Sequence, residues 1–215
     1  MTEAAIADHG LIGDLQTAAL VSTEGSVDWF CCPRFDSPSV FGALLDNDRG
    51  GHFRIRPARG GCETKQMYFP DTAVLITRFI TENGVGEVVD FMPPSGREAT
   101  DNHRLVRMVR CVRGEMSFEV EVAPRFDYGR CPHQTEVTES GAVFTSPGLT
   151  LTLHAVREPD DERGGHFRVR PARGRSGWPS SSGCSMTPWR SGAPGSLAAR
   201  MPGAGARCCT VPPSH

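Results

Sequence analysis

The sequence predicts an all-β protein: an antiparallel, supersandwich-like β-sandwich over residues 1–160, followed by a disordered C-terminal tail over residues 161–215. Short apolar runs rich in β-branched and aromatic residues recur roughly every 8–15 residues, with Gly or Pro between them. Several runs alternate with a period of two, which is typical of strands with one buried face. No stretch keeps a helical period. This combination indicates two packed antiparallel sheets.

Composition excludes several classes of partner. The chain has 215 residues, enough for one well-buried domain or two small ones, and a net charge of −2. A balanced charge gives no electrostatic reason to expect binding to nucleic acid or to a membrane surface. The N-terminus lacks the basic and apolar regions of a signal peptide, and no apolar run approaches the roughly 20 residues that cross a bilayer. We therefore expect a cytoplasmic protein without nucleic-acid or membrane partners.

The stretch 11–36 contains the first hairpin. Apolar runs at 17–22 and 27–32 flank the turn Thr23-Glu24-Gly25-Ser26, in which glycine can adopt a positive φ. The second run ends at Cys32-Pro33, because proline cannot donate to a strand ladder. The hairpin therefore places an aromatic residue, an arginine and acidic residues near one of its ends.

A second hairpin is expected further along the chain. Residues 37–45 are expected to form a loop and a short apolar turn, and 50–57 a half-buried strand that ends at a proline. The segment 67–81 leads through a turn at 82–84 into a strand at 87–92, which Pro93 and Pro94 close.

Two more strand pairs complete the sandwich. Residues 103–113 are expected to turn at 113–115 and pair with 116–123, where valines and a phenylalanine alternate with glutamates. A fourth group comprises 134–138, 142–145 and 149–156, with a turn at Ser140-Gly141.

The chain changes character after about residue 161. From 175 to 215 it contains no Asp, Glu, Lys, Ile, Phe or Tyr, and about half of its residues are Gly, Pro or Ser. Such a segment cannot bury enough apolar area to offset about 1–2 kcal/mol of backbone entropy per ordered residue. The segment RGGHFRIRPARG at 49–60 returns as RGGHFRVRPARG at 163–174. The two segments are identical except at Ile55 and Val169, whereas the sequences on either side of them differ. We therefore favour a recent duplication or a frame-shifted tail over a structural repeat.

Cysteine spacing gives no metal or redox site. The eight cysteines contain no CxxC motif, so neither a zinc ribbon nor a thioredoxin-like site is expected, and we predict no metal and no cofactor. Cys31 and Cys111 are interpreted as unreactive thiols within strands.

Three stretches together resemble a known family. Residues 12–46 (IGDLQTAALVSTEGSVDWFCCPRFDSPSVFGALLD), 69–93 (FPDTAVLITRFITENGVGEVVDFMP) and 121–130 (EVAPRFDYGR) are similar to the trehalase-like N-terminal β-sandwich domain of bacterial glycoside hydrolase family 15 proteins. That family includes trehalases and glucoamylases. The resemblance implies a domain that packs on an (α/α)6 catalytic barrel. In that barrel two glutamates, roughly 6.5–9.5 Å apart, hydrolyse an α-glucosidic bond with inversion.

The resemblance implies a non-catalytic role for this chain. The segment after residue 161 is too short for a barrel, and no glutamate matches the catalytic pair, so no catalytic residue is assigned and no turnover is expected from the chain alone. Its role would be to brace the barrel and to line one side of the substrate cleft, with an α-glucoside such as trehalose as ligand. The candidate substrate-binding residues are Trp29, Arg34, Asp36, Arg125, Asp127 and Tyr128.

Each candidate also has a structural interpretation. Trp29 can belong to the core, Arg34 and Asp36 can pair locally at a turn, and 125–128 can form a turn clamp. Asp14 is expected to cap backbone N–H groups rather than take part in chemistry. Two other functions stay open: a stand-alone carbohydrate-binding module, and a non-functional gene fragment whose barrel-facing apolar surface causes aggregation.

Overall fold

The computed structural model describes residues 5–94, 96, 98–138 and 141–155, and the backbone of three further strands at 164–171, 197–202 and 207–210. The described part is built from strands, and its one helical segment is a 3-10 turn at Ile6–Asp8. No helix within it is long and apolar enough to span a membrane. The predicted all-β class is therefore confirmed, with mostly antiparallel pairing.

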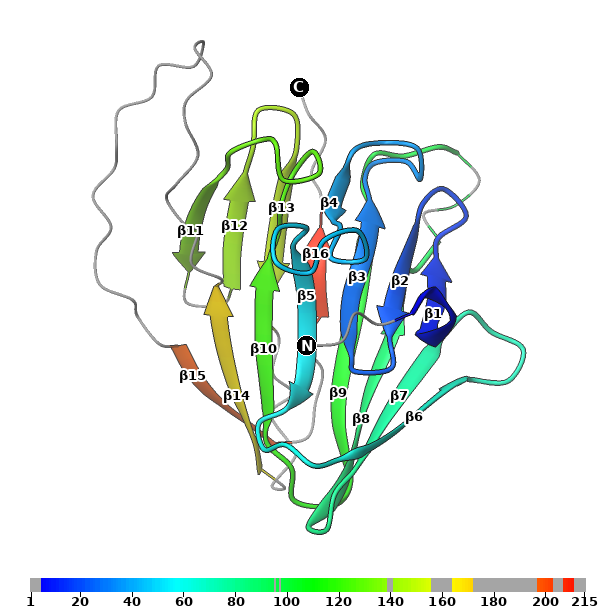
Figure 1. Cartoon of the computed structure of the whole chain (residues 1–215), viewed down its shortest axis with the longest axis vertical. Coiled ribbons are helices and arrows are strands. Elements are labelled where there is room, and N and C mark those ends of the chain that lie inside the picture. The colour runs from blue at the N-terminus through cyan, green and yellow to red at the C-terminus, as the bar shows by residue number, and fades with distance from the viewer. Residues whose placement is uncertain are drawn as a thin grey trace.

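One sheet, here sheet A, contains the first hairpin. Its path runs β1-β2-β3-β5-β10, with β4 paired to β3. Figure 1 shows these strands side by side, with β7, β8 and β9 behind them. The strands are β1 (His9–Gly13), β2 (Ala18–Ser22), β3 (Ser26–Cys31), β4 (Ser39–Phe41), β5 (His52–Pro57) and β10 (Phe118–Ala123).

Sheet B is made of two antiparallel groups. One group is β6-β7-β8-β9 and the other is β11-β12-β13. Their strands are β6 (Glu63–Tyr68), β7 (Leu75–Ile80), β8 (Gly84–Phe91), β9 (Arg104–Gly114), β11 (Gln134–Thr138), β12 (Gly141–Thr145) and β13 (Thr150–His154).

Three strands lie in the region predicted to be disordered. The backbone of β14 (Gly164–Pro171) runs parallel to β10, β15 (Leu197–Pro202) pairs with β14, and β16 (Arg207–Thr210) lies between β13 and β9. The rest of the 161–215 tail is outside the described residues. Its disorder therefore stays a prediction.

The first predicted hairpin is present as β2 and β3. Leu20 lies opposite Trp29 in this pair, and Gly25 in the turn has φ +80°. A Cβ at Gly25 would overlap the carbonyl oxygen of Ile55, so glycine is needed both for its dihedral angle and for this close approach. The pairs β7–β8 and β11–β12–β13 also follow the prediction.

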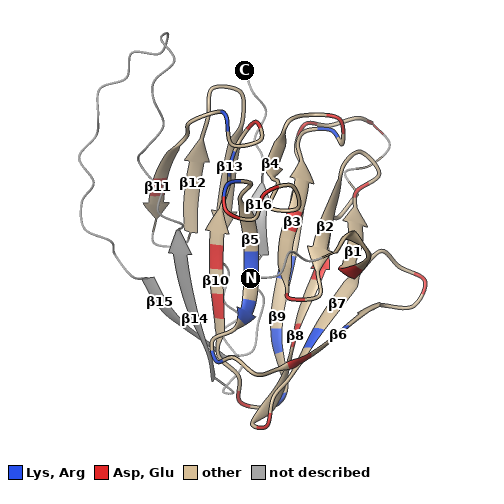
Figure 2. Cartoon of the chain, in the orientation of Figure 1, with Lys and Arg blue, Asp and Glu red and all other residues tan. Residues whose placement is uncertain are grey.

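The predicted pairing of 103–113 with 116–123 is wrong. β9 pairs with β8 in sheet B, whereas β10 pairs with β5 in sheet A, so the chain crosses from one sheet to the other between these strands. Opposite charges face each other in the observed pairing of β10 with β5, where Glu119 lies opposite Arg56 and Glu121 opposite Arg54, and such pairs favour it. Figure 2 shows these acidic and basic positions side by side on β10 and β5.

Within residues 5–155, three further strands were not predicted from the sequence as strands. β4 lies inside the expected loop at 37–45, while β1 and most of β6 fall where no strand was assigned. β4 and β6 are poorly marked because their side chains do not alternate between buried and exposed positions. Pairing with β3 and with β7 specifies them instead.

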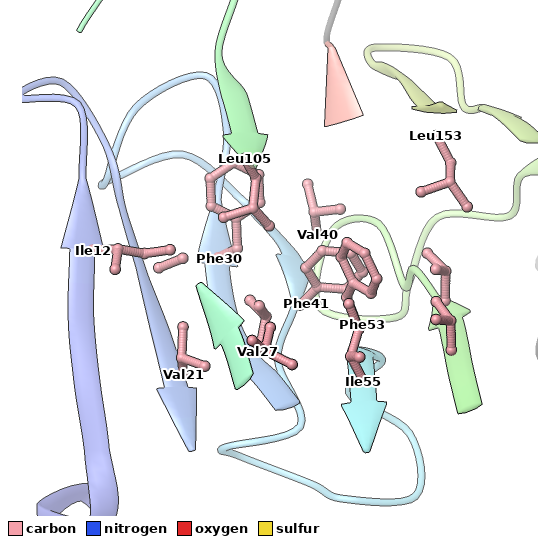
Figure 3. Packing of buried hydrophobic residues seen from close by; sticks show 14 of the residues in the cluster. Ile12, Val21, Val27, Phe30, Val40, Phe41, Phe53, Ile55, Leu105 and Leu153 are labelled. Carbon is pink, nitrogen blue, oxygen red and sulfur yellow. The ribbon is translucent and has the colours of Figure 1, made fainter. Parts of the chain in front are cut away.

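A single apolar core fills the space between the sheets. Figure 3 shows how side chains from sheet A and Leu105 of β9 converge on it. Its largest fully buried apolar side chains are Phe30, Phe41, Phe53, Phe79, Phe144, Ile12, Ile55, Leu75, Leu105 and Leu151. Burial of each such side chain stabilises the fold by roughly 1.5–3 kcal/mol relative to exposure.

A buried arginine links the two sheets. Arg107 of β9 donates from Nε to Asp90 Oδ1 (2.8 Å) and from Nη2 to the carbonyl oxygen of Gly25 (2.8 Å). It also donates to the carbonyl oxygen of Phe53, and its guanidinium lies 4.7 Å from the centre of the Phe53 ring. The charge is thus fully paired inside the core, which is the condition for burying it.

Candidate functional site

Two candidate residues far apart in the sequence are in contact. The ring of Trp29, on the outer side of β3, lies 6.2 Å from the ring of Tyr128 at a tilt of 45°. Tyr128 is 43% exposed and Trp29 is half-buried. An accessible tryptophan–tyrosine pair is the type of apolar surface on which a sugar ring can stack, and Tyr also offers a hydroxyl for hydrogen bonding.

The turn that carries Tyr128 has an unusual backbone. Asp127 (φ +52°), Tyr128 (φ +55°) and Gly129 (φ +77°) follow one another with positive φ. Arg130 holds this turn from outside, because it donates from Nη2 to Asp127 Oδ1 (2.7 Å) and lies 5.6 Å from the Tyr128 ring centre. Positive φ at non-glycine residues costs energy and is concentrated at functional sites.

Arg125 and Asp127 act locally in this turn. The backbone N–H of Arg125 donates to the carbonyl oxygen of Val40 (2.8 Å), and its guanidinium donates to the carbonyl oxygen of Pro124 (3.1 Å). Asp127 is occupied by Arg130. These contacts match the turn-clamp interpretation. Tyr128 instead contacts the ring of Trp29.

Arg34 and Asp36 lie in the loop beyond the end of β3. The Arg34 guanidinium is 3.8 Å from Asp101 Oδ1, and its backbone N–H donates to Ser37 Oγ (3.1 Å). Asp36 is exposed. The ion pair directs Arg34 toward the loop that precedes β9, and none of the described contacts joins it to the Trp29–Tyr128 pair.

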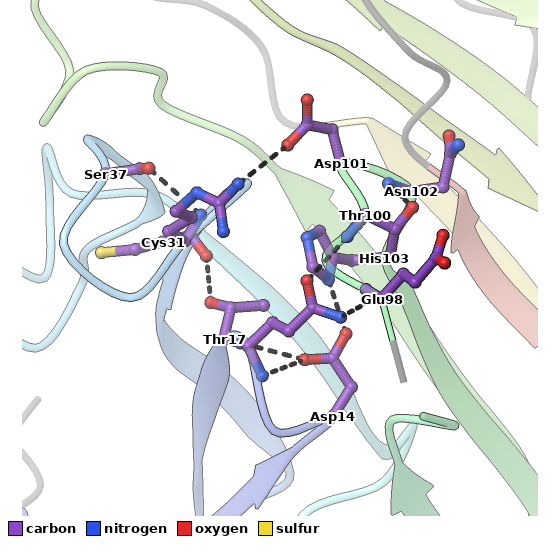
Figure 4. Close-up of polar contacts among 11 residues, drawn as sticks. Asp14, Thr17, Cys31, Ser37, Glu98, Thr100, Asp101, Asn102 and His103 are labelled. Carbon is purple, nitrogen blue, oxygen red and sulfur yellow. Dashed lines mark hydrogen bonds and ion pairs between the residues drawn. The ribbon is translucent and has the colours of Figure 1, made fainter. Parts of the chain in front are cut away.

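A buried polar cluster joins two loops and the end of β3 at this end of the sandwich (Figure 4). Asp14 Oδ1 accepts hydrogen bonds from the backbone N–H groups of Gln16 (3.1 Å) and Thr17 (2.9 Å), which confirms its predicted capping role. Its other oxygen, Oδ2, accepts from His103 Nδ1 (2.5 Å). The Thr17 hydroxyl donates to the carbonyl oxygen of Cys31 (2.6 Å).

Gln16 extends this cluster to the loop before β9. Its side-chain oxygen accepts from the backbone N–H of Thr100 (2.8 Å), and its side-chain nitrogen donates to the carbonyl oxygen of Glu98 (3.4 Å). The turn between β1 and β2, the end of β3 and the loop before β9 are therefore fixed to one another. We name this turn, the loop that follows β3 and the loop before β9 together the loop end: residues 14–17, 32–38 and 98–103.

The electrostatics of the cluster favour a charged Asp14. Burial by itself would raise the pKa of Asp14, but hydrogen bonds from His103, Thr17 and Gln16 outweigh burial and lower the pKa below its ordinary value. His103 Nε2 is buried and has no hydrogen-bond partner among the described residues. A buried polar group without a hydrogen bond destabilises a fold by about 1–3 kcal/mol, so the other contacts of the cluster must outweigh this penalty.

The described residues offer no evident centre for metal or thiol chemistry. No group of three or more His, Cys, Asp or Glu side chains among them is arranged to hold a metal ion. Burial raises the pKa of the Cys32 thiol to about 12, helped by the nearby Asp14 charge, and burial also raises the pKa of the Cys31 thiol.

Buried Glu87 is held between the guanidinium groups of Arg78 and Arg110, with Nε–Oε distances of 2.7 Å to both.

Sequence reasoning identified part of this site. It pointed to Trp29 and Tyr128 separately and to Asp14 as a cap, but it missed His103 and Gln16. No local signal marks either residue, because their partners lie more than eighty positions away in the chain.

Comparisons with known proteins cover most of the chain. A protein-family model described as "Trehalase-like, N-terminal" matches residues 2–156. The trehalase of Mycolicibacterium smegmatis is 37% identical over 170 residues, which cover 72% of this chain and 24% of that protein. Trehalase 1 of Sulfolobus acidocaldarius is 40% identical over 154 residues (71% and 25%), and trehalase 2 is 36% identical over 151 residues (68% and 24%). This chain thus spans about a quarter of the length of these relatives. No solved structure matches it.

Proposed function

Because this chain belongs to the family of trehalase-like N-terminal domains, we propose that it serves as the non-catalytic N-terminal domain of a family 15-type glycoside hydrolase. Its partner in this role is the (α/α)6 catalytic domain, which it braces. The substrate of the complete enzyme is trehalose or an α-glucan, hydrolysed with inversion. The proposal places the protein in the cytoplasm.

One observation carries this proposal. The family match over 2–156 coincides with the sandwich that the structure describes at 5–155, whereas the relatives named trehalase are about four times as long as the matched part. A catalytic pair with a water between its carboxyl groups needs a cleft with two accessible acids. Among the described residues, the fully buried acids are used in ion pairs: Asp14 with His103, Glu87 with two arginines and Asp90 with Arg107. This supports a structural role.

The first test is turnover by the pure chain. We expect no glucose release from trehalose, maltose or starch. Activity that rises in proportion to protein and disappears when an acidic residue of this chain is replaced would overturn the proposal.

The second test is complementation. The full chain is co-expressed with Mycolicibacterium smegmatis trehalase from which the quarter matched by this chain has been deleted. We expect the two to co-purify and the deleted trehalase to regain trehalose hydrolysis. A deleted trehalase that is equally soluble and active without this chain would contradict a bracing role.

A carbohydrate-binding module is the second candidate, and the Trp29–Tyr128 pair favours it. If sugars stack there, titration with trehalose or maltose should give a saturable change in tryptophan fluorescence that Tyr128→Ala removes. Trp178 and Trp189 are also present in the chain, so Trp29→Phe serves as the control that assigns the signal. A linear or absent response would exclude this candidate.

A non-functional fragment is the remaining alternative from the sequence. It would aggregate or melt without cooperativity once its apolar interface has no partner. A soluble chain with a cooperative thermal transition would argue against it.

A further inference from the structure

The loop end exposes two large apolar side chains at its tips. Leu15, between β1 and β2, is 93% exposed, and Phe35, in the loop after β3, is 74% exposed. Figure 1 places both loops at the same end of the molecule, next to the loop that precedes β9. Both residues lie within the 12–46 stretch that carries the family resemblance, but neither contributes to the core of this chain.

Leu15 is held in a conformation that is unfavourable for leucine. Its φ is +75°, in the left-handed region where a side chain with a Cβ costs roughly 1–2 kcal/mol and where glycine or asparagine is preferred. The turn cannot relax, because Asp14 is buried on one side and Gln16 is bonded to the 98–103 loop on the other. A strained leucine that is wholly in solvent contributes nothing to the isolated fold.

The buried cluster beneath these tips is also unusually costly. Asp14, Thr17 and His103 are all nearly inaccessible, and His103 Nε2 is left without a described partner. Their common effect is to fix the β1–β2 turn relative to the end of β3 and to the loop before β9. Preorganised loops lower the entropy cost of an interface, which gives a physical reason for the arrangement.

The surroundings have the composition of an interface. Arg34 and Asp101 stand beside the tips as a solvent-exposed ion pair with side-chain exposures of 51% and 55%. Apolar anchors within a charged rim are typical of protein–protein contact sites, whose energy is concentrated in a few central residues.

We propose that the loop end is the surface through which this chain docks onto the catalytic part of a trehalase, with Leu15 and Phe35 as the anchoring side chains. The inference rests on the proposed function. The occupant follows from chain length, because the relatives continue for about three quarters of their length outside the matched region. Arg34 and Asp36, predicted as substrate-cleft residues, then lie beside this contact.

The test uses the full chain and the same deleted Mycolicibacterium smegmatis trehalase. The double variant Leu15→Gly/Phe35→Ser removes both anchors without touching the buried cluster. Val137→Ser is the matched control, since Val137 is 50% exposed on β11, at the opposite edge of the molecule in Figure 1. Circular dichroism and thermal melting verify that both variants are folded.

The expected result is a loss of affinity for the deleted trehalase of about tenfold or more in Leu15→Gly/Phe35→Ser, and an unchanged affinity in Val137→Ser. Equal binding by wild type and double variant would overturn the docking surface while the proposed function stands. Failure of the wild-type chain itself to bind would overturn the proposed function. If the chain alone forms a dimer that the double variant dissociates, the surface mediates self-association and the proposal is wrong.

Discussion

Arg107 joins the two sheets through hydrogen bonds inside the core. Its guanidinium pairs with Asp90 from its own sheet and with carbonyl groups of Gly25 and Phe53 from the other sheet. Arg107→Leu would leave a buried carboxylate and two buried carbonyl groups unpaired. We expect a loss of about 3–5 kcal/mol in the free energy of unfolding, measured by urea denaturation.

Two further variants check the mechanism. Arg113→Leu, at an exposed position of the same strand, should change stability by no more than about 0.5 kcal/mol. Adding Asp90→Val to Arg107→Leu should recover part of the loss, since the unpaired charge is removed. If the loss of stability in the double variant equalled the sum of the losses measured separately in Arg107→Leu and Asp90→Val, the penalty would not come from the orphaned carboxylate.

His133 should make the stability depend on pH. Burial between the rings of Phe126 (5.3 Å) and Phe144 (6.0 Å), together with the nearby Arg125 charge, lowers the pKa of His133 below 6.5. The native state therefore prefers the neutral imidazole. The stabilisation that neutral His133 gives to the native state is fully present above pH 6.5. It is lost as the pH falls through the lowered native-state pKa of His133.

The replacement His133→Phe isolates this effect. Urea denaturation between pH 7.5 and pH 5 should show the wild type losing more stability on acidification than the variant. His52, whose pKa burial and Arg54 also lower, adds a parallel decline in both proteins. Identical pH profiles of wild type and His133→Phe would contradict the assignment.

At the scale of elements, the β2–β3 turn is set by Gly25. A Cβ there would overlap the Ile55 carbonyl oxygen and lie 2.9 Å from the Phe79 ring, in addition to the strain of φ +80°. We expect Gly25→Ala to destabilise the chain by about 1–3 kcal/mol. Gly60→Ala is the control, because nothing lies within 4 Å of its added Cβ. Equal melting temperatures of the two variants would contradict this account.

Local sequence patterns predicted strands better than strand partners. The period of two in β5 and β10 is a local property, and both strands appear where it predicts them. The choice of partner is not local: β10 pairs with β5, which is distant in the sequence, and there Glu119 and Glu121 lie opposite Arg56 and Arg54. A turn signal such as Gly114 marks where the chain bends, but it does not determine which sheet the next strand joins.

The same distinction applies to the candidate site. The capping role of Asp14 follows from its neighbours Gln16 and Thr17, so the sequence predicts it. The contacts of Trp29 with Tyr128 and of Asp14 with His103 join distant segments, and only the folded chain brings them together. The assignment of Arg34 and Asp36 to a substrate cleft stays a prediction.

At the scale of the whole molecule, the core that the structure describes lies within the family-matched region. Among residues 5–155, whose burial is described, the buried apolar cluster runs from Ile12 to Leu153, and the match ends at residue 156. Beyond it, β14 lies along the edge of β10 that β5 leaves free, and the few register pairs of β16 join β13 to β9. What the structure describes between the two regions is therefore backbone pairing at strand edges.

Truncation after residue 156 tests this division. Because no cluster residue is removed, we expect the shortened chain to keep a cooperative thermal transition with a midpoint within a few degrees of the full chain, which corresponds to less than about 1 kcal/mol. Limited proteolysis of the full chain should stop at a fragment of matching size, since cleavage concentrates where the backbone is least held by packing. A large drop in the midpoint would instead mean that β14 and β16 are integral to the sheets. The repeated segment 163–174 would then be a working part of the fold, because it would complete the edge of the strand that its first copy already pairs with.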